Sequence, residues 1–280
     1  MATVVLSIFA ALFYGAADFC GGLATKRTTV FSVTVLSQAS GFVVLLALVP
    51  FFPGHATPVD YVWGTLAGVC GGLGLALLYH ALSIGKMGVV SPITAVLAAA
   101  LPLGAGIFRG EHLSFLQIAG IALALVAIVL ISLSTEPDGK REFSTTGVRE
   151  AIVSGIAIGG FYLFISYSHP GAGLHGLLAA RIASTLCLAI VAAGIGASLI
   201  PKNGTVPLIV FGGVIDMSAN ALYVLATFHG YLSIAVVLTS LYPASTVFLA
   251  RLVLKERLAL VQKFGVALAL AGVTLIALRP

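Results

Sequence analysis

Charged side chains are scarce in this chain. Asp, Glu, Lys and Arg make up 8% of its 280 residues, whereas 60% of the residues are hydrophobic. A membrane-spanning helix needs about 20 mostly apolar residues. Four stretches without any of these charged residue types each have room for one or two such helices: 28–59, 113–135, 151–180 and 217–250. This composition excludes an ordinary water-soluble domain and predicts an all-α integral membrane protein that lies in a lipid bilayer.

Signatures of enzymes and of nucleic-acid-binding proteins are also missing. The chain has no HExxH, no GxSxG and no glycine-rich phosphate loop. Its three cysteines, Cys20, Cys70 and Cys187, form no CxxC pair and no Cys/His metal spacing, so we expect them to be packing residues. The net charge of +5 comes without a basic stripe of interleaved aromatics. We therefore expect no enzyme, no nucleic-acid partner, no metal and no cofactor.

Hydrophobic runs broken by glycine, proline and charge predict ten transmembrane helices. The runs are continuous rather than alternating, which favours helices over strands. The first run has no basic segment before it and contains Asp18, so we expect it to be retained rather than cleaved as a signal peptide. The predicted ranges are 3–24, 30–50, 62–84, 87–109, 114–133, 148–168, 174–198, 206–228, 231–253 and 259–278.

A repeat relates the two halves of the chain. With a displacement of 145 residues, the first half aligns with the second at Glu111 and Glu256, Gln117 and Gln262, Gly120 and Gly265, and Gly85 and Gly230. Five spans in each half make the second half enter the bilayer upside down, as in the inverted repeats of many secondary transporters. We predict two inverted five-helix repeats, 1–133 and 148–280, which a polar linker at 134–147 joins into one single-chain transport unit.

The sequence pattern resembles a known family. Residues 240–258 read SLYPASTVFLARLVLKERL and are followed by Gln262, Gly265 and AGVTLI at 271–276; the first half repeats the pattern from PIT at 92–94 to RGEHL at 109–113. Over nearly the whole chain this is similar to the EamA domain of the drug/metabolite transporter superfamily. The resemblance implies a ten-helix transporter of small metabolites. It also implies a central cavity formed by spans 1, 3, 4, 6, 8 and 9, with spans 2, 5, 7 and 10 more peripheral.

Two signals for the orientation disagree. Lys and Arg gather in the loops after the odd-numbered spans, and by the positive-inside rule this places both termini outside the cytoplasm. The resemblance implies cytoplasmic termini, so both orientations stay open. Either orientation suits a multi-pass protein of the plasma membrane, which in a bacterium is the inner membrane.

Asp216 lies near the middle of the predicted span 206–228. A mid-bilayer Asp costs about 2.5 to 3.5 kcal/mol on insertion scales, so it must face protein or water and is a functional candidate. Asn220 and Tyr223 follow at i+4 and i+7 and share its face. We expect a proton or cation site at Asp216. The structural alternative is a protonated carboxyl group that hydrogen-bonds a neighbouring helix.

Asp18 lies near the end of the first span, on the membrane side where the span with Asp216 starts. We expect the two carboxyl groups to line one cavity and to hold a shared proton or a cation. Tyr79 and His80 of the third span approach the same side, and His80 is a candidate for substrate binding or pH sensing. The alternatives are that Asp18 satisfies a helix end and that His80 is structural.

Prolines mark corresponding spans of the two halves. Pro243 falls at the centre of span 231–253 and removes the hydrogen bond to the Thr239 carbonyl, which predicts a kink. Pro92 and Pro102 lie on either side of the matching position in the fourth span, and paired interruptions indicate a transporter site. The neutral hydrogen-bonding candidates near these prolines are Thr239, Tyr242, Ser91 and Thr94.

Glycines and three further charged residues have structural interpretations. The stripes Gly64, Gly68, Gly72 and Gly155, Gly159 predict close helix contacts. We expect Arg181 to extend its guanidinium to the nearer membrane surface. Glu111 and Glu256 precede spans 5 and 10, where a carboxylate stabilises a helix N-terminus.

The sequence predicts a secondary carrier that exports small metabolites, such as amino acids or related compounds, or drugs by alternating access, with proton coupling as an open option. An uptake carrier or a sugar or nucleotide-sugar carrier of the same superfamily is the alternative. A membrane-embedded enzyme or a receptor is the rival class, but the chain shows neither a catalytic centre nor room for a soluble signalling domain.

Overall fold

The computed structural model describes residues 1–85, 87–132, 146–202, 204–254 and 260–277, and these residues contain helices and no strand. Most of the predicted linker, residues 134–145, and Glu256 lie outside the described residues. The first half contains α1 (Ala2–Thr25), α2 (Val30–Leu48), the 3-10 turn η1 (Val49–Phe51), α3 (Pro58–Ile84), α4 (Met87–Phe108) and α5 (Phe115–Ser132). The second half contains α6 (Val148–Ile165), η2 (Pro170–Ala172), α7 (His175–Gly194), α8 (Val206–Phe228), α9 (Leu232–Thr239), α10 (Tyr242–Leu254) and α11 (Leu260–Ala277).

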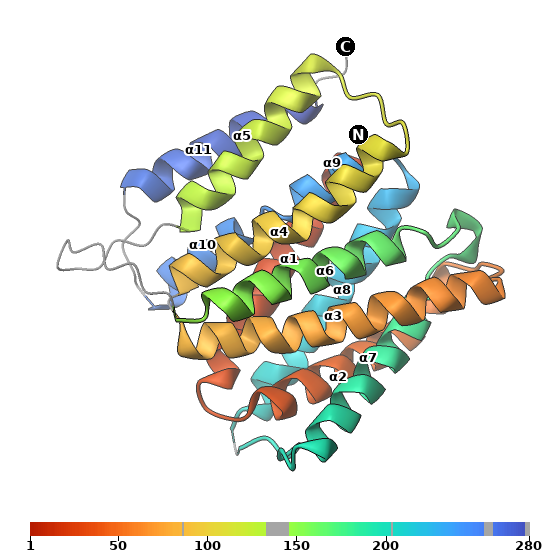
Figure 1. The fold of residues 1–280 in the computed structure, drawn as a ribbon, viewed down its shortest axis with the longest axis vertical. Coiled ribbons are helices and arrows are strands. Elements are labelled where there is room, and N and C mark those ends of the chain that lie inside the picture. Colours follow the sequence, from red (N-terminus) through yellow and green to blue (C-terminus); the bar gives the residue numbers. More distant parts are fainter. Residues whose placement is uncertain (86, 133–145, 203, 255–259, 278–280) are drawn as a thin grey trace.

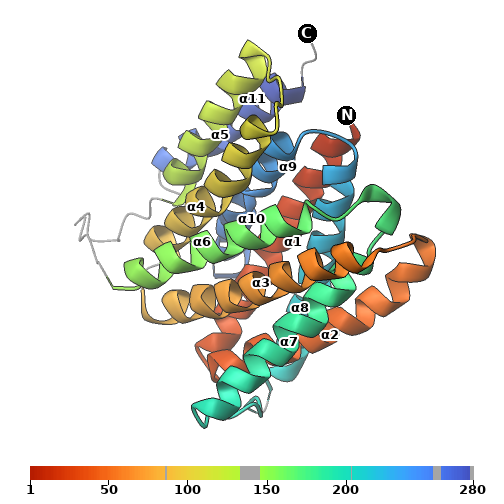
Figure 2. The same cartoon turned by 45° about the vertical axis from the view of Figure 1, so that its right-hand side comes forward.

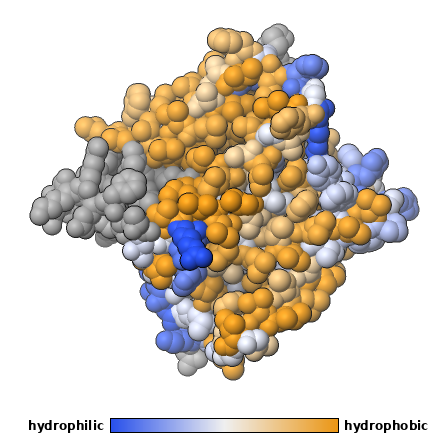
Figure 3. Space-filling view, in the orientation of Figure 1, coloured by the Kyte–Doolittle hydropathy of each residue, from blue (hydrophilic) through white to orange (hydrophobic). Residues whose placement is uncertain are grey.

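The outer surface is that of a membrane protein. Six helices are long and apolar enough to cross a bilayer, and four apolar segments of 10–17 residues add to them. Large apolar side chains such as Val43, Ile190 and Leu270 are 65 to 70% exposed, and the face in Figure 3 is mostly hydrophobic, with hydrophilic residues towards its edges. Lipid stabilises such a surface, whereas water does not. The chain is an integral, multi-pass membrane protein.

The helices of the two halves pack in equivalent pairs (Figures 1 and 2). Helix α1 lies along α8, and its counterpart α6 lies along α3. In the same way, α3 packs on α7 and α8 packs on α2, while α5 and α11 pair with each other at one edge of the molecule. Each main contact therefore joins one repeat to the other, so that neither half forms the central bundle by itself.

Small residues bring these helices close together. Along α3, Gly64, Gly68 and Gly72 lie successively against Gly176, Ala180 and Ser184 of α7, and a Cβ at Gly68 would overlap the Ala180 backbone. On α6, Gly155 and Gly159 lie against α4. Both predicted stripes are confirmed as helix contacts, as expected where helices in lipid associate through backbone proximity.

The chain breaks where Pro243 predicts a kink. Helix α9 ends at Thr239 and α10 begins at Tyr242, which places Pro243 in the first turn of the new helix, where its missing N–H costs little. Hydroxyl groups then hold α10 against α1: Ser245 Oγ donates to the Ala11 carbonyl at 3.1 Å and Thr246 Oγ1 donates to the Gly15 carbonyl at 3.1 Å.

The matching interruption in the fourth span does not occur. Helix α4 is continuous from Met87 to Phe108, through both Pro92 and Pro102, so the prediction of paired breaks is wrong. Pro102 leaves the Ala98 carbonyl without its intrahelical partner. That carbonyl lies against Gly159 of α6, where a glycine Cα–H can approach it and where a Cβ would lie 3.1 Å from the oxygen.

Candidate functional site

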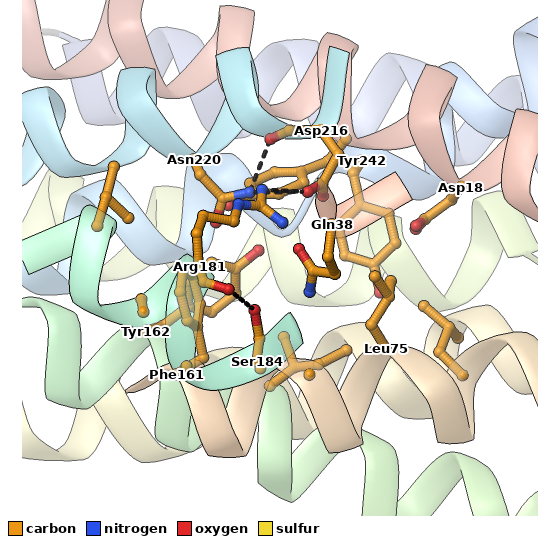
Figure 4. A pocket seen from close by; sticks show the side chains of 18 residues that line it. Asp18, Gln38, Leu75, Phe161, Tyr162, Arg181, Ser184, Asp216, Asn220 and Tyr242 are labelled. Atoms are coloured by element: carbon orange, nitrogen blue, oxygen red, sulfur yellow. Dashed lines mark hydrogen bonds and ion pairs between the residues drawn. The ribbon is translucent and has the colours of Figure 1, made fainter. Parts of the chain in front are cut away.

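A cavity lies between the two repeats (Figure 4). Its wall comes from α1, α2 and α3 of the first half and from α6, α7, α8 and α10 of the second. Helices α3 and α7 pack closely against each other at one edge of the cavity. Both repeats therefore contribute side chains to one cavity, and substrate sites of secondary transporters lie at such repeat interfaces.

An ion pair lies in the wall of this cavity. Arg181 of α7 donates from Nη2 to Asp216 Oδ2 of α8 at 2.5 Å, and Nε lies 3.0 Å from the sulfur of Met217. Asn220, one turn further along α8, donates from Nδ2 to Asp216 Oδ2 at 3.2 Å and to the Asp216 carbonyl at 2.7 Å. The side chains of Arg181 and Asp216 are only 6% and 10% exposed, so each charge is compensated by the other rather than by water.

The ion pair corrects the prediction for Arg181. This side chain does not extend to a membrane surface, because its guanidinium points into the bundle and lies beside Gly41 of α2, where there is no side chain to displace it. Asp216 does hydrogen-bond a neighbouring helix, and its partner there is the Arg181 guanidinium.

Asp18 of α1 lines the same cavity as Asp216, as the sequence predicts. No hydrogen bond or ion pair joins its carboxyl group to another side chain of the described residues. Because Arg181 already pairs with Asp216, the charges that line the cavity sum to a single excess negative charge when Asp18 is ionised. Asp18 is therefore the acid in this cavity whose charge is open to a proton or a ligand.

Three buried polar groups in the cavity wall have no partner within the described part of the chain. They are the hydroxyl groups of Tyr14 and Tyr242 and the Oε1 of Gln38, on side chains that are 8%, 3% and 4% exposed. Buried polar groups are normally hydrogen-bonded, and leaving one unpaired costs about 1 to 3 kcal/mol. In the cavity wall, these unpaired groups can form hydrogen bonds with a ligand.

The opposite wall, from α3 and α6, is apolar: Gly71, Leu75, Leu78, Ile158 and Phe161 line it. The contrast between the polar and the apolar wall follows from differences between equivalent positions of the two repeats. With the displacement of 145 residues, Gly71 is equivalent to Asp216 and Leu75 to Asn220, and all four line the cavity. Equivalent positions thus supply polar groups on one side and apolar groups on the other.

The remaining predicted site residues lie away from the cavity. Tyr223 is buried and donates to the Tyr162 carbonyl at 3.2 Å, and Thr94 donates to the Ala151 carbonyl at 3.2 Å between α4 and α6. His80 is exposed on the outer face of α3, whereas Tyr79 is buried against Gly21 of α1. Ser91 and Thr239 are buried outside the cavity lining. Of the predicted binding residues, the structure brings Asp18, Asp216, Asn220 and Tyr242 together.

The cavity also differs from the expectation based on spans. Spans 2 and 7, expected to be peripheral, contribute Gln38 and Arg181, while none of the described side chains of α4 lines the cavity. Neither Gln38 nor Tyr162 was predicted as a site residue, and Arg181 was expected at the membrane surface. A useful signal existed: Gln38 and Arg181 are costly polar residues within apolar spans, and such residues usually face the interior of a bundle.

Aromatic side chains pack between the helices towards the end of the molecule where α6 and α8 terminate. Tyr162 lies between Tyr14 and Tyr223, with ring centroids 6.1 and 4.6 Å apart, and these three rings form a tyrosine layer. Trp63 of α3 stacks on Tyr167 at 4.7 Å, and Arg109 Cζ lies 4.0 Å above the same ring. Aromatic stacking and cation–π contacts each add about 0.5 to 1.5 kcal/mol. Aromatic contacts therefore join the two repeats at this end.

At the same end of the molecule, two carboxylates of the first repeat accept hydrogen bonds from backbone groups of the second repeat. Asp60, in the first turn of α3, accepts from the backbone N–H of His169 at 2.7 Å and from Thr57 Oγ1 at 2.7 Å. Glu111 accepts from the backbone N–H groups of Leu232 and Ser233 and from the Ser233 hydroxyl. Glu111 thus caps α9 of the second repeat and not the helix that follows it, which corrects the sequence expectation while keeping the physical reason, a carboxylate at a helix N-terminus.

No group of three or more His, Cys, Asp or Glu side chains with a metal-binding arrangement occurs among the described residues. The site instead combines a buried ion pair, one free carboxyl group, unpaired hydroxyl and amide groups and an apolar wall, between helical repeats in a membrane. These features define the class of a multi-pass membrane transporter with a small-molecule site at the repeat interface.

Comparison with known proteins identifies the family. The family model of the EamA-like transporter family matches residues 1–133 and 145–278. The chain belongs to the EamA-like transporter family, within the drug/metabolite transporter superfamily, whose members are transporters.

Two individual proteins are also similar. An uncharacterized protein of Methanocaldococcus jannaschii is 26% identical over 132 residues, which cover 47% of this chain and 96% of that protein. That relative therefore corresponds to about one repeat. A solved crystal structure of another protein matches with a TM-score of 0.74 and 16% identity over 98% of this chain and 96% of that chain, and it supports the fold alone.

Proposed function

We propose that the protein is a proton-coupled secondary carrier that exports small organic molecules by alternating access. The observation that carries this proposal is the cavity between the repeats, in which Asp18 and three buried polar groups have no partner among the described residues. Each of these unpaired groups lowers stability until a ligand or water satisfies it, so a ligand that enters the cavity gains hydrogen bonds there.

Ten membrane crossings in two inverted repeats fit this function. The four shorter apolar segments, 93–108, 115–130, 232–246 and 263–276, would complete the six long spans. The equivalent contacts of α1 with α8 and of α6 with α3 suit two halves that rock about a central site. All parts of the site lie within one chain, which therefore suffices as the transport unit.

The packing suggests which end is closed. The tyrosine layer and the Asp60 and Glu111 contacts join the repeats at the end where α6 and α8 terminate. From the tyrosine layer, the cavity extends towards Asp18 and Leu78, which lie in the later turns of α1 and α3. For the cavity to open to the other side of the membrane, the aromatic contacts at this end would have to separate, and the loops at the other end of the molecule would have to move together.

Proton coupling is assigned to Asp18 and not to Asp216. Asp216 is occupied by Arg181 and Asn220, so protonating it would leave a buried guanidinium uncompensated. Asp18 has no ion-pair partner among the described residues, so its carboxyl group can bind either a proton or a ligand. Under an inward proton gradient, a carrier that exchanges the two moves its ligand outward.

Flux measurements in proteoliposomes test the proposal. A panel of radiolabelled amino acids, amines, sugars and amphipathic drugs is loaded, with and without an imposed pH gradient. We expect gradient-driven flux of at least one compound, and loss of the gradient dependence in Asp18→Asn. Absence of flux for every compound, or an unchanged gradient dependence in Asp18→Asn, would contradict the function or the coupling, respectively.

A further inference from the structure

The charge of the cavity wall limits which ligands can enter. The ionisable side chains that line the cavity with Asp18 are Asp216, Arg181, Tyr14, Tyr162 and Tyr242, and α2 contributes the neutral Gln38; Tyr79 lies nearby, against Gly21 of α1. The tyrosines are neutral at neutral pH, and Arg181 and Asp216 compensate each other. With Asp18 ionised, the site therefore has one net negative charge.

The unpaired groups of the wall are mainly acceptors. The carboxylate of Asp18 and the Oε1 of Gln38 can only accept hydrogen bonds, while the hydroxyl groups of Tyr14 and Tyr242 can donate or accept. A ligand that satisfies this set must contribute donors. An anionic ligand would bring further acceptors and a second negative charge to the same place, which low dielectric makes costly.

The apolar wall faces these acceptors across the cavity. Leu75 and Phe161 lie opposite the helices that contribute Asp18 and Asp216 (Figure 4). This arrangement suits a molecule with an apolar or aromatic body at one end and a positively charged donor group at the other. Aromatic rings in the wall also stabilise a nearby cation through their π faces.

Resting on the proposed carrier function, we propose that the ligand is a protonated amine with an apolar body, which binds Asp18 through its ammonium group and exchanges there for one proton. On release, a proton adds to the Asp18 carboxylate while the ammonium ion leaves intact with its own protons. One positive charge thus replaces another, no bond of the ligand is broken, and each exchange is electroneutral.

Four probes that share one phenyl ring test this ligand class in nanodiscs by calorimetry: phenethylammonium, phenyltrimethylammonium, phenylalanine and phenylpropionate. We expect phenethylammonium to bind best. Phenyltrimethylammonium should bind more weakly because it has no N–H donor, and phenylpropionate should not bind. Binding of phenethylammonium should weaken in mildly acidic buffer and release up to one proton per ligand there, as measured from buffers with different ionisation enthalpies.

Variants connect the binding to Asp18. Asp18→Asn should weaken phenethylammonium binding by about tenfold or more, because a buried charge pair is lost. Asp18→Glu keeps the charge and should keep the binding. Glu150→Gln, the same loss of charge in the first turn of α6 and outside the cavity lining, is the matched control and should bind like the wild type.

Three results would overturn the proposal: equal or tighter binding of phenylpropionate or phenylalanine, wild-type affinity of Asp18→Asn, or no binding of either cation. The proteoliposome panel separates this failure from failure of the carrier function. If the panel shows flux of amino acids or sugars but not of amines, the carrier function stands and the amine class falls. If no compound moves, both fall.

Discussion

Breaking the Arg181–Asp216 ion pair should destabilise the protein strongly. The two side chains are 6% and 10% exposed, and the other polar partner of the guanidinium among the described residues is the weak acceptor Met217 Sδ. Removing one member of a buried pair costs about 3 to 5 kcal/mol, because the remaining charge is left uncompensated. Asp216→Ala should approach the upper value. Asp216→Asn, whose amide oxygen still accepts from Nη2, should approach the lower.

A double-mutant cycle isolates the pair. Replacing both residues, as in Arg181→Met with Asp216→Asn, removes the uncompensated charge, so the double variant should be more stable than the sum of the single variants by about 2 to 3 kcal/mol. The free energy of unfolding is measured by equilibrium denaturation in mixed micelles for the wild type, both single variants and the double variant. Additive single effects, or a loss of less than about 1 kcal/mol in Asp216→Asn, would refute a buried, mutually compensating pair.

Four further variants test helix packing and the hydrogen bonds of two carboxylates. Gly68→Ala should cost about 1 to 3 kcal/mol because its Cβ overlaps the Ala180 backbone, whereas Gly104→Ala, in a helix but with open space around it, should gain about 0.5 to 1 kcal/mol; equal shifts in melting temperature would argue against the α3–α7 contact. Glu111→Ala removes the acceptor for the first-turn amides of α9 and should cost about 0.5 to 2 kcal/mol in thermal unfolding. Asp60→Asn should lose a similar amount through its contacts with Thr57 and the α6–α7 loop and should increase proteolysis of that loop, while wild-type protection would disprove the link.

Helix positions were accessible from the sequence because they depend on local properties. Apolar runs bounded by glycine, proline and charge predict where helices lie, and each predicted range contains a helix in the structure. The break at Pro243 was predictable for the same reason. The continuity of α4 through Pro102 was not, because it depends on Gly159 of another helix, where a backbone without a side chain accommodates the freed carbonyl.

The ion-pair and hydrogen-bond partners of residues on different helices could not be predicted from the sequence. Asp216 was identified by the cost of a carboxylate at that depth, but its partner, Arg181, lies 35 residues away on a different helix, and an arginine near a span end has an equally good explanation at the membrane surface. Glu111 shows the same limit: the preference of carboxylates for a helix N-terminus was clear, whereas the helix that it caps begins 121 residues later.

Comparison of equivalent positions in the two repeats separates residues that pack the helices from residues that line the cavity. Positions that match between the halves, such as Gly68 and Gly213, pack small residues against α7 and α2 and position the helices. Positions that differ, such as Gly71 and Asp216 or Leu75 and Asn220, give the cavity its apolar and polar walls. The polar residues of the second half also carry a helix contact of their own, because Asp216 of α8 pairs with Arg181 of α7. The matched positions thus position the helices, and the positions that differ set the polarity of the cavity, so we expect ligand preference to depend on the latter.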